Sequence, residues 1–153
     1  QRIATWADIV TAHRISGPDI IDGIHAAWGE VGRKGSVLIL AQMSSSENLL
    51  DARYTEKTVA SCKGVPGVCG FIGNGSDPLS ISSLRESVGP EKLILTPGIN
   101  FDPSQSVMGQ RYGHPTEAIR SGADAVIVGS GIIRSDSVSK AAAQYANATM
   151  DEM

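Results

Sequence analysis

The sequence has few of the features that mark several large classes of protein. Only 5% of its 153 residues are aromatic, and there are two cysteines, Cys62 and Cys69. These cysteines lack metal-ligand spacing and no disulfide framework surrounds them, so we expect reduced thiols, no metal site and a cytoplasmic location. The longest continuous apolar run, residues 37–41, is far too short to span a membrane, so we expect no membrane partner.

Neither positive nor negative charge is in large excess. The chain has 13 Lys and Arg against 16 Asp and Glu, a formal net charge of −3, and its longest basic run is Arg33-Lys34. A nucleic-acid-binding surface needs a basic stripe, so we expect no nucleic-acid partner. The biases of collagen-like, coiled-coil and disordered chains are absent as well, which leaves an ordinary globular domain.

The sequence does contain a regular alternation of two patterns. Short runs rich in Val, Ile and Leu occur at residues 7–13, 37–42, 68–72, 93–96 and 125–128. Nearly continuous apolar runs of this length are typical of strands buried on both faces, as in a parallel sheet. Helical patterns follow each run, at residues 19–28, 51–63, 79–88, 116–121 and 135–150. The order predicts five strand-helix units in a single domain over residues 1–153.

Length sets a limit on this arrangement. An intact barrel of eight strand-helix units needs roughly 200 to 250 residues, so a complete barrel is excluded. Several residues have expected structural roles: Asp77 as a helix cap before Pro78, and Trp6 and Trp28 as packing residues.

Ligands bind such units at the carboxyl ends of the strands, where the loops are rich in Gly and small hydroxyl residues. Residues 129–133 (GSGII) follow the last apolar run, a context suited to a backbone anion site, although Gly-rich turns are common in any loop. The loop over residues 98–115 has little periodicity and carries Gln110, Arg111, Tyr112 and His114 near its end. These are donors suited to phosphate, and a solvated polar loop is the alternative.

Five segments, in this order along the chain, match a known family. They are residues 6–13 (WADIVTAH), 40–45 (LAQMSS), 95–99 (LTPGI), 109–112 (GQRY) and 127–132 (IVGSGI). Together they resemble the orotidine 5′-phosphate decarboxylase family, particularly the decarboxylase domain of eukaryotic UMP synthases, over nearly the whole chain. The resemblance implies an α/β fold, a partial TIM (β/α)8 barrel whose parallel strands correspond to strands 4 to 8. It also implies decarboxylation of orotidine monophosphate to UMP in pyrimidine biosynthesis, without a metal or organic cofactor, by a homodimer.

The resemblance also assigns roles to single residues. Ser44 would hydrogen-bond the pyrimidine, while Gln110 and Tyr112 would reach the phosphate from a closing loop, with Arg111 between them. Gly129 and Ser130 would hold the phosphate after the last strand. The family normally has Arg at the Ser130 position, and Ser offers one neutral hydrogen bond in place of a charged, bidentate contact. Arg111 and Arg134 are candidates to compensate.

The catalytic part of the family's site is missing. The reaction leaves a carbanion that a pre-positioned cation must stabilise. The family uses a Lys in an Asp-x-Lys-x-x-Asp motif that this sequence lacks. The lysines here either precede predicted strands or lie on predicted helices, and they are Lys34, Lys57, Lys63, Lys92 and Lys140. We therefore expect no catalytic residue in this chain and no activity from the chain alone.

The first residue is Gln1, so we expect the chain to begin inside a longer product and to pair with the missing N-terminal half of the barrel, strands 1 to 3. Five parallel strands leave two unpaired edges, which favours association. Two other hypotheses stay open. One is a non-catalytic phosphate-ligand-binding or interaction module derived from this barrel family. The other is a different phosphate-binding barrel enzyme of the ribulose-phosphate type.

Overall fold

The structure is a computed structural model that describes residues 2–102 and 109–152. Its strands are β1 (Ile9–Ala12), β2 (Ser36–Leu40), β3 (Val68–Ile72), β4 (Leu93–Thr96) and β5 (Ala125–Val126). They form one parallel sheet in the order of the sequence, so each strand pairs with the strand that follows it. This confirms the predicted α/β fold with sequential strand-helix units.

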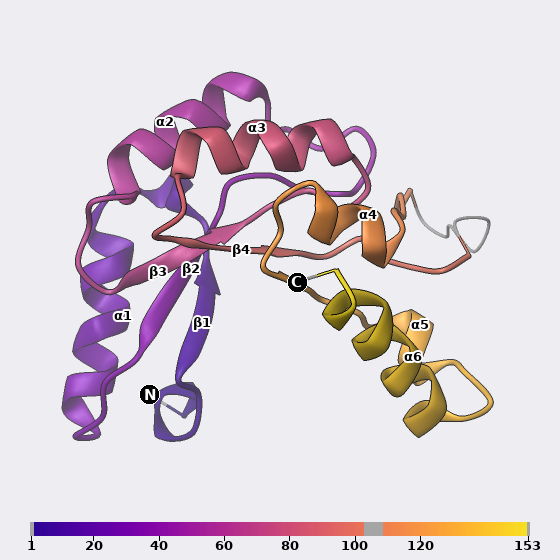
Figure 1. Cartoon of the computed structure of the whole chain (residues 1–153). Coiled ribbons are helices and arrows are strands. Elements are labelled where there is room, and N and C mark those ends of the chain that lie inside the picture. Colours follow the sequence, from indigo (N-terminus) through magenta and orange to yellow (C-terminus); the bar gives the residue numbers. More distant parts are fainter. Residues whose placement is uncertain (1, 103–108, 153) are drawn as a thin grey trace.

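Helices follow the strands as the sequence predicts. They are α1 (Asp19–Glu30), α2 (Ala52–Cys62), α3 (Pro78–Val88), α4 (Pro115–Arg120), α5 (Ser130–Ile133) and α6 (Val138–Met150), with short 3-10 turns at Ile3–Thr5 and Arg14–Ser16. Figure 1 shows α1, α2 and α3 along one side of the sheet and α6 beside α4 and α5. Every helix in these ranges is too short or too polar to cross a bilayer.

The long helix predicted over residues 135–150 is wrong at its start. α6 begins at Val138, and the separate short helix α5 precedes it. The hydroxyl of Ser135 donates to the carbonyl of Ile132 at 2.7 Å, and Ser137 precedes α6 with an extended backbone. Serine side chains compete with helical backbone hydrogen bonds in this way, so the two helices are separated.

Two aspartates begin the helices that lie closest to the candidate site. The Asp51 carboxylate accepts a hydrogen bond from the Tyr54 amide at 2.7 Å at the start of α2. Asp77 accepts from the Leu79 amide at 3.1 Å at the start of α3, and Pro78 is the first helical residue. The predicted cap at Asp77 is confirmed.

The core lies between the sheet and its helices. Ile39, Phe71 and Ile94 are paired across β2, β3 and β4 and are fully buried, as are Ile81 and Leu84 of α3. Side chains alternate along a strand, so the neighbours of these residues point to the opposite face of the sheet.

On that opposite face the predicted burial is wrong for the outer strands. Ile9 of β1 is 49% exposed and Ile127 beyond β5 is 41% exposed. β1 and β5 each pair with one neighbour only, and within the described ranges no helix is packed against this face. The two strands therefore lack the second layer that buries both faces of a parallel strand.

The two tryptophans behave differently. Trp28 is buried, and its indole N–H donates to the carbonyl of Ala7 at 2.9 Å. A Cβ at Gly35 would lie 2.2 Å from the Trp28 ring, so only glycine fits there. Trp6 is 70% exposed, and its prediction as a packing residue is wrong because it lies before the unpaired edge strand β1.

Candidate active site

The candidate site is built from loops at the carboxyl ends of the strands. Two isolated bridges organise it, Ser45 with Gln110 and Ile99 with Gly113. The segment over residues 109–113 therefore runs from the loop after β2 to the loop after β4. Residues 103–108 of the same long loop lie outside the described residues.

Ser44 is the centre of one group of contacts. It is buried, and its hydroxyl accepts a hydrogen bond from Gln110 Nε2 at 2.6 Å. The Ser44 carbonyl accepts from the backbone N–H of Arg111 at 3.3 Å and from Arg111 Nε at 3.2 Å. The structure thus brings together three of the residues that the sequence analysis singled out.

Tyr112 and Ser130 form the second group. Their hydroxyls lie 3.2 Å apart, which joins the loop segment to the first residue of α5. Gly129 lies directly before α5, and a Cβ placed on it would meet no atom within 4 Å. Neither packing nor backbone angle requires glycine there, so the backbone at Gly129 faces open space that a ligand can enter.

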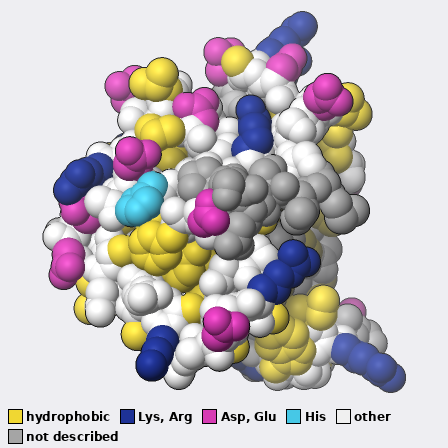
Figure 2. Space-filling model, turned by 90° about the vertical axis from the view of Figure 1, so that its right-hand side faces the viewer, with side chains coloured by type: hydrophobic (Ala, Val, Ile, Leu, Met, Phe, Trp, Pro, Cys, Tyr) yellow, Lys and Arg dark blue, Asp and Glu magenta, His cyan; other side chains and the backbone are white. Residues whose placement is uncertain are grey.

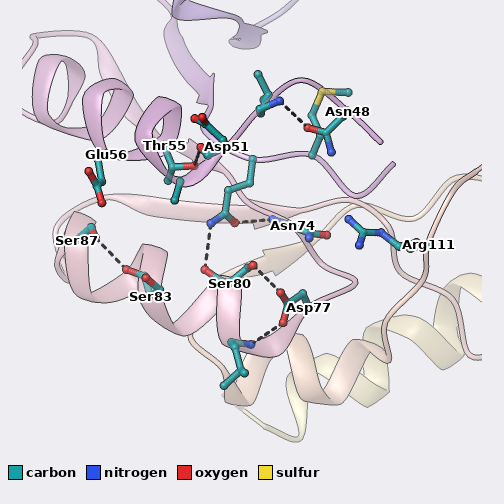
Figure 3. A pocket seen from close by; sticks show the side chains of 15 residues that line it. Asn48, Asp51, Thr55, Glu56, Asn74, Asp77, Ser80, Ser83, Ser87 and Arg111 are labelled. Carbon is teal, nitrogen blue, oxygen red and sulfur yellow. Dashed lines mark hydrogen bonds between the residues drawn. The ribbon is translucent and has the colours of Figure 1, made fainter. Parts of the chain in front are cut away.

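Arg111 is directed away from this second group. Gln110, Tyr112 and Ser130 are not among the residues that line the cavity reached by Arg111. Arg111 lines a cavity that extends between α2 and α3. Figure 3 shows its guanidinium at one end of that cavity. The expected grouping of Arg111 with the phosphate-binding residues stays a prediction.

Close backbone contacts explain several glycines in these loops. A Cβ on Gly98, whose φ is +79°, would lie 2.4 Å from the Ser44 Cβ. A Cβ on Gly113 would lie 2.1 Å from the Gly75 carbonyl oxygen. These glycines are needed for the loops to pack on one another.

The sequence analysis missed the residues that hold the loops in place. The backbone N–H and the hydroxyl of Ser46 both donate to the Gly109 carbonyl, at 2.8 and 3.0 Å. Gln42 accepts from the Asn74 amide at 2.9 Å and donates to the Ser80 carbonyl at 3.2 Å, which links β2 to α3. Polar residues between a strand and a helix carry no pattern that distinguishes such supports from solvated loop residues.

The charged residues predicted to lie away from the site do so. Lys92 donates to the carbonyl of Val68, at the start of β3, and Lys63 donates to the carbonyl of Ser87 at 3.1 Å, at the end of α3. Lys57 and Lys140 lie on α2 and α6, and Lys34 precedes β2. Asp124, at the start of β5, pairs with Arg85.

No three His, Cys, Asp or Glu side chains of residues 2–102 and 109–152 converge as a metal site would require.

The fold and the site together define a partial (β/α) barrel with hydrogen-bonded polar loops at the carboxyl ends of its strands. The sequence profile described as the orotidine 5′-phosphate decarboxylase / HUMPS family matches residues 1–145. The chain belongs to this family.

Curated relatives agree with this assignment. The chain is 36% identical over 152 residues to uridine 5′-monophosphate synthase of Bos taurus, a match that spans 98% of this chain and 29% of the relative. It is 39% identical over 137 residues to orotidine 5′-phosphate decarboxylase of Mycosarcoma maydis, which covers 86% of this chain and 46% of that protein. The chain therefore spans about half of the length of these relatives or less.

Solved structures show the same fold. Orotidine 5′-monophosphate decarboxylase from Methanocaldococcus jannaschii, complexed with the inhibitor BMP, matches with a TM-score of 0.74 at 19% identity. That match covers 97% of this chain and 66% of that chain. The Pyrococcus horikoshii enzyme gives a TM-score of 0.72 at 23% identity and is covered to 64%. The chain thus has the fold of about two thirds of these barrels, in agreement with the partial barrel that the resemblance implied.

Proposed function

We propose that this chain supplies the phosphate-binding part and some of the pyrimidine-binding part of an orotidine 5′-phosphate decarboxylase. The whole enzyme would convert orotidine monophosphate to UMP as a cytoplasmic homodimer. Membership of the family supports the reaction, and one structural observation supports the share taken by this chain. The segment at residues 109–113 bonds to Ser44 on one side and to Ser130 on the other, and these are the residues expected to bind base and phosphate.

Each group has a chemical part in this proposal. The hydroxyls of Tyr112 and Ser130, 3.2 Å apart, can both donate to a phosphate oxygen that enters the open space at Gly129. Ser44 offers its hydroxyl to the edge of a pyrimidine, and Gln110, the residue expected to reach the phosphate, donates to that hydroxyl in this structure. Because one short segment carries Gln110 and Tyr112, a ligand bound to both holds that segment against the two loops.

The chain does not supply the cation that decarboxylation needs. Loss of carbon dioxide leaves negative charge on the ring, which a positively charged group must stabilise at the reacting carbon. The lysines lie on helices or at the amino ends of strands, away from the loops that hold Ser44 and Ser130. The missing N-terminal part of the barrel is therefore proposed as the source of the catalytic residues.

Binding of UMP and AMP to the purified chain tests this proposal, because the two nucleotides differ only in the base. We expect UMP to bind more tightly than AMP in a calorimetric titration. Ser44→Ala lowers the affinity for UMP several-fold and leaves the affinity for AMP unchanged, since it removes one neutral hydrogen bond to the pyrimidine. Tyr112→Phe lowers the affinity for both nucleotides about tenfold, because a phosphate hydrogen bond is charge-assisted.

Tyr54→Phe is the matched control. The Tyr54 hydroxyl is buried without a partner among the described residues, so its removal leaves both affinities unchanged. Equal affinity for UMP and AMP, or equal effects of Tyr112→Phe and Tyr54→Phe, contradicts the proposal.

A further inference from the structure

A cavity of about 520 Å³ lies between α2 and α3. Its walls come from both helices, from the loops after β2 and β3, and from Arg111. Figure 3 shows Arg111 and Asn74 at one end of it, with Glu56 and Ser83 toward the other.

Unused hydrogen-bond donors gather at the first end. Asn74 is 6% exposed, and its amide oxygen accepts from the backbone N–H and the hydroxyl of Ser76, at 3.1 and 2.7 Å. Its Nδ2 group makes no hydrogen bond with the described residues and its backbone is fixed by Gln42, so Nδ2 remains available to a ligand in the cavity.

Arg111 adds a charge to the same end. Its Nε donates to the Ser44 carbonyl, which fixes the direction of the side chain, and its two terminal nitrogens make no hydrogen bond or ion pair with the described residues. A guanidinium held in one direction, whose two terminal NH2 groups have no partner among the described residues, suits a carboxylate, which it can bind through two parallel hydrogen bonds.

Acceptors line the rest of the cavity. Asp51 uses one oxygen to cap α2, and its second oxygen makes no bond within the described ranges; the same holds for the Glu56 carboxylate and the Ser83 hydroxyl. Hydroxyl groups of a ligand can donate to all three.

The negative charge at the helix caps is partly balanced. Asp77 accepts bonds from the Leu79 amide and the Ser80 hydroxyl, and Asp51 from the Tyr54 amide. Both carboxylates also lie at the positive ends of helix dipoles. An anion beside Arg111 therefore meets less repulsion than a count of carboxylates suggests.

We propose that this cavity binds a small polyhydroxylated carboxylate, of the sugar-acid type. The carboxylate lies against Arg111 and the Asn74 amide, and the hydroxyls donate to acceptors of α2 and α3. The site is distinct from the one formed by Tyr112 and Ser130, because Arg111 lines this cavity and those two residues do not.

Gluconate is the probe, measured by calorimetry on the whole chain. Sorbitol has the hydroxyls without the carboxylate, and acetate has the carboxylate without the hydroxyls. We expect gluconate to bind at about millimolar concentration and both comparison compounds at least about tenfold more weakly. Arg111→Gln and Asn74→Asp each lower the affinity for gluconate by at least about tenfold. The first removes a positive charge, and the second replaces a donor by a negative charge that repels the gluconate carboxylate.

Arg53→Gln is the matched control, because Arg53 is exposed on α2 and does not line the cavity, so it leaves gluconate binding unchanged. Tyr112→Phe also leaves it unchanged, which separates this site from the proposed nucleotide site. Gluconate that binds no better than sorbitol overturns the proposal. An Arg111→Gln variant that binds gluconate as tightly as Arg53→Gln also overturns it. So does gluconate binding that is weakened by Tyr112→Phe alone, because that result places the ligand in the other site.

Discussion

At the scale of single residues, the segment that carries Gln110 and Tyr112 depends on Gly109. Gly109 has a φ of +74°, and a Cβ on it would lie 2.8 Å from the Ser46 hydroxyl oxygen. The same Ser46 donates two hydrogen bonds to the Gly109 carbonyl. The residue before the proposed binding groups is therefore held by its neighbour and restricted to glycine.

Gly109→Ala should lower the free energy of unfolding by about 1–2 kcal/mol, because a left-handed backbone is costly for residues with a Cβ. Gly23→Ala is the matched control: Gly23 is exposed in α1 and a Cβ there meets no atom within 4 Å. The control should gain up to about 1 kcal/mol. Urea unfolding measures both, and a Gly109→Ala variant as stable as the control contradicts the assigned role.

The cysteines give a second prediction. Burial raises the pKa of the Cys69 thiol above its ordinary 9.0, an effect that nearby hydrogen bonds and Lys92 only partly offset. Well below pH 9.0 the thiol is protonated in both the folded and the unfolded chain. Above that pH the unfolded thiol ionises first, so stability is lost as pH rises.

At pH 9, alkylation of Cys69 by iodoacetamide should be slower in the folded chain than in urea, because the thiolate is the reactive form. Cys62 is fully buried and should react only after unfolding. Mass spectrometry of the two peptides gives both rates. Equal rates for Cys69 in the folded and unfolded chain would show that burial does not control its ionisation.

At the scale of elements, Arg85 of α3 connects three parts of the chain at the amino ends of the strands. Its guanidinium donates to the carbonyls of Gly122, Gly89 and Lys92 at 2.9, 2.7 and 2.8 Å. It also pairs with Asp124, which in turn accepts from the Ile94 amide at 2.7 Å. One side chain thus joins α3 to the starts of β4 and β5.

Arg85→Ala should lower the free energy of unfolding by about 2–3 kcal/mol, because it leaves several acceptors without a donor. Arg53→Ala, on the exposed side of α2, should change it by less than about 0.5 kcal/mol. Chemical denaturation of the two variants provides the comparison. A loss of similar size in both would mean that the contacts of Arg85 contribute nothing specific.

The elements also show what the sequence can and cannot predict. Continuous apolar runs predicted all five strands, and Asp77 with Pro78 predicted the start of α3, because these signals are local. The exposure of Ile9 and Ile127 was not predictable, since it depends on which layers cover the sheet.

The direction of Arg111 was missed for a similar reason. The loop over residues 98–115 was interpreted as aperiodic, and its bridges to Ser45 and Ile99 join loops that are distant in the sequence. The motif identified the residues, but which of them meet depends on contacts between distant loops.

At the scale of the whole molecule, the sheet ends in two strands, β1 and β5, that each have one unpaired edge within the described residues, and exposed apolar side chains lie near them. Figure 2 looks onto the side that carries α4 to α6 in Figure 1 and shows hydrophobic side chains gathered among charged ones. Ile133 and Val138, near α5 and α6, are 74% and 53% exposed. Unpaired edges and exposed apolar surface favour association.

The isolated chain should therefore sediment as dimers or larger species in analytical ultracentrifugation. Ile9→Lys, on the edge strand β1, should shift the distribution toward monomer, since an edge charge opposes pairing. Leu49→Lys tests the specificity: Leu49 is 97% exposed in the loop after β2 and should leave the distribution unchanged. A wild-type chain that sediments as a single monomer contradicts the prediction.

The central claim is that this chain contributes nucleotide-binding groups to a decarboxylase whose catalytic cation lies elsewhere. Carbon dioxide release from carboxyl-labelled orotidine monophosphate tests it most directly. The account predicts no release by the chain alone. It predicts release when the chain is combined with the preceding strand-helix units of the Mycosarcoma maydis enzyme. Release by the chain alone contradicts the account. So does an inactive mixture, when the same Mycosarcoma maydis units do release carbon dioxide after they are combined with their own C-terminal part.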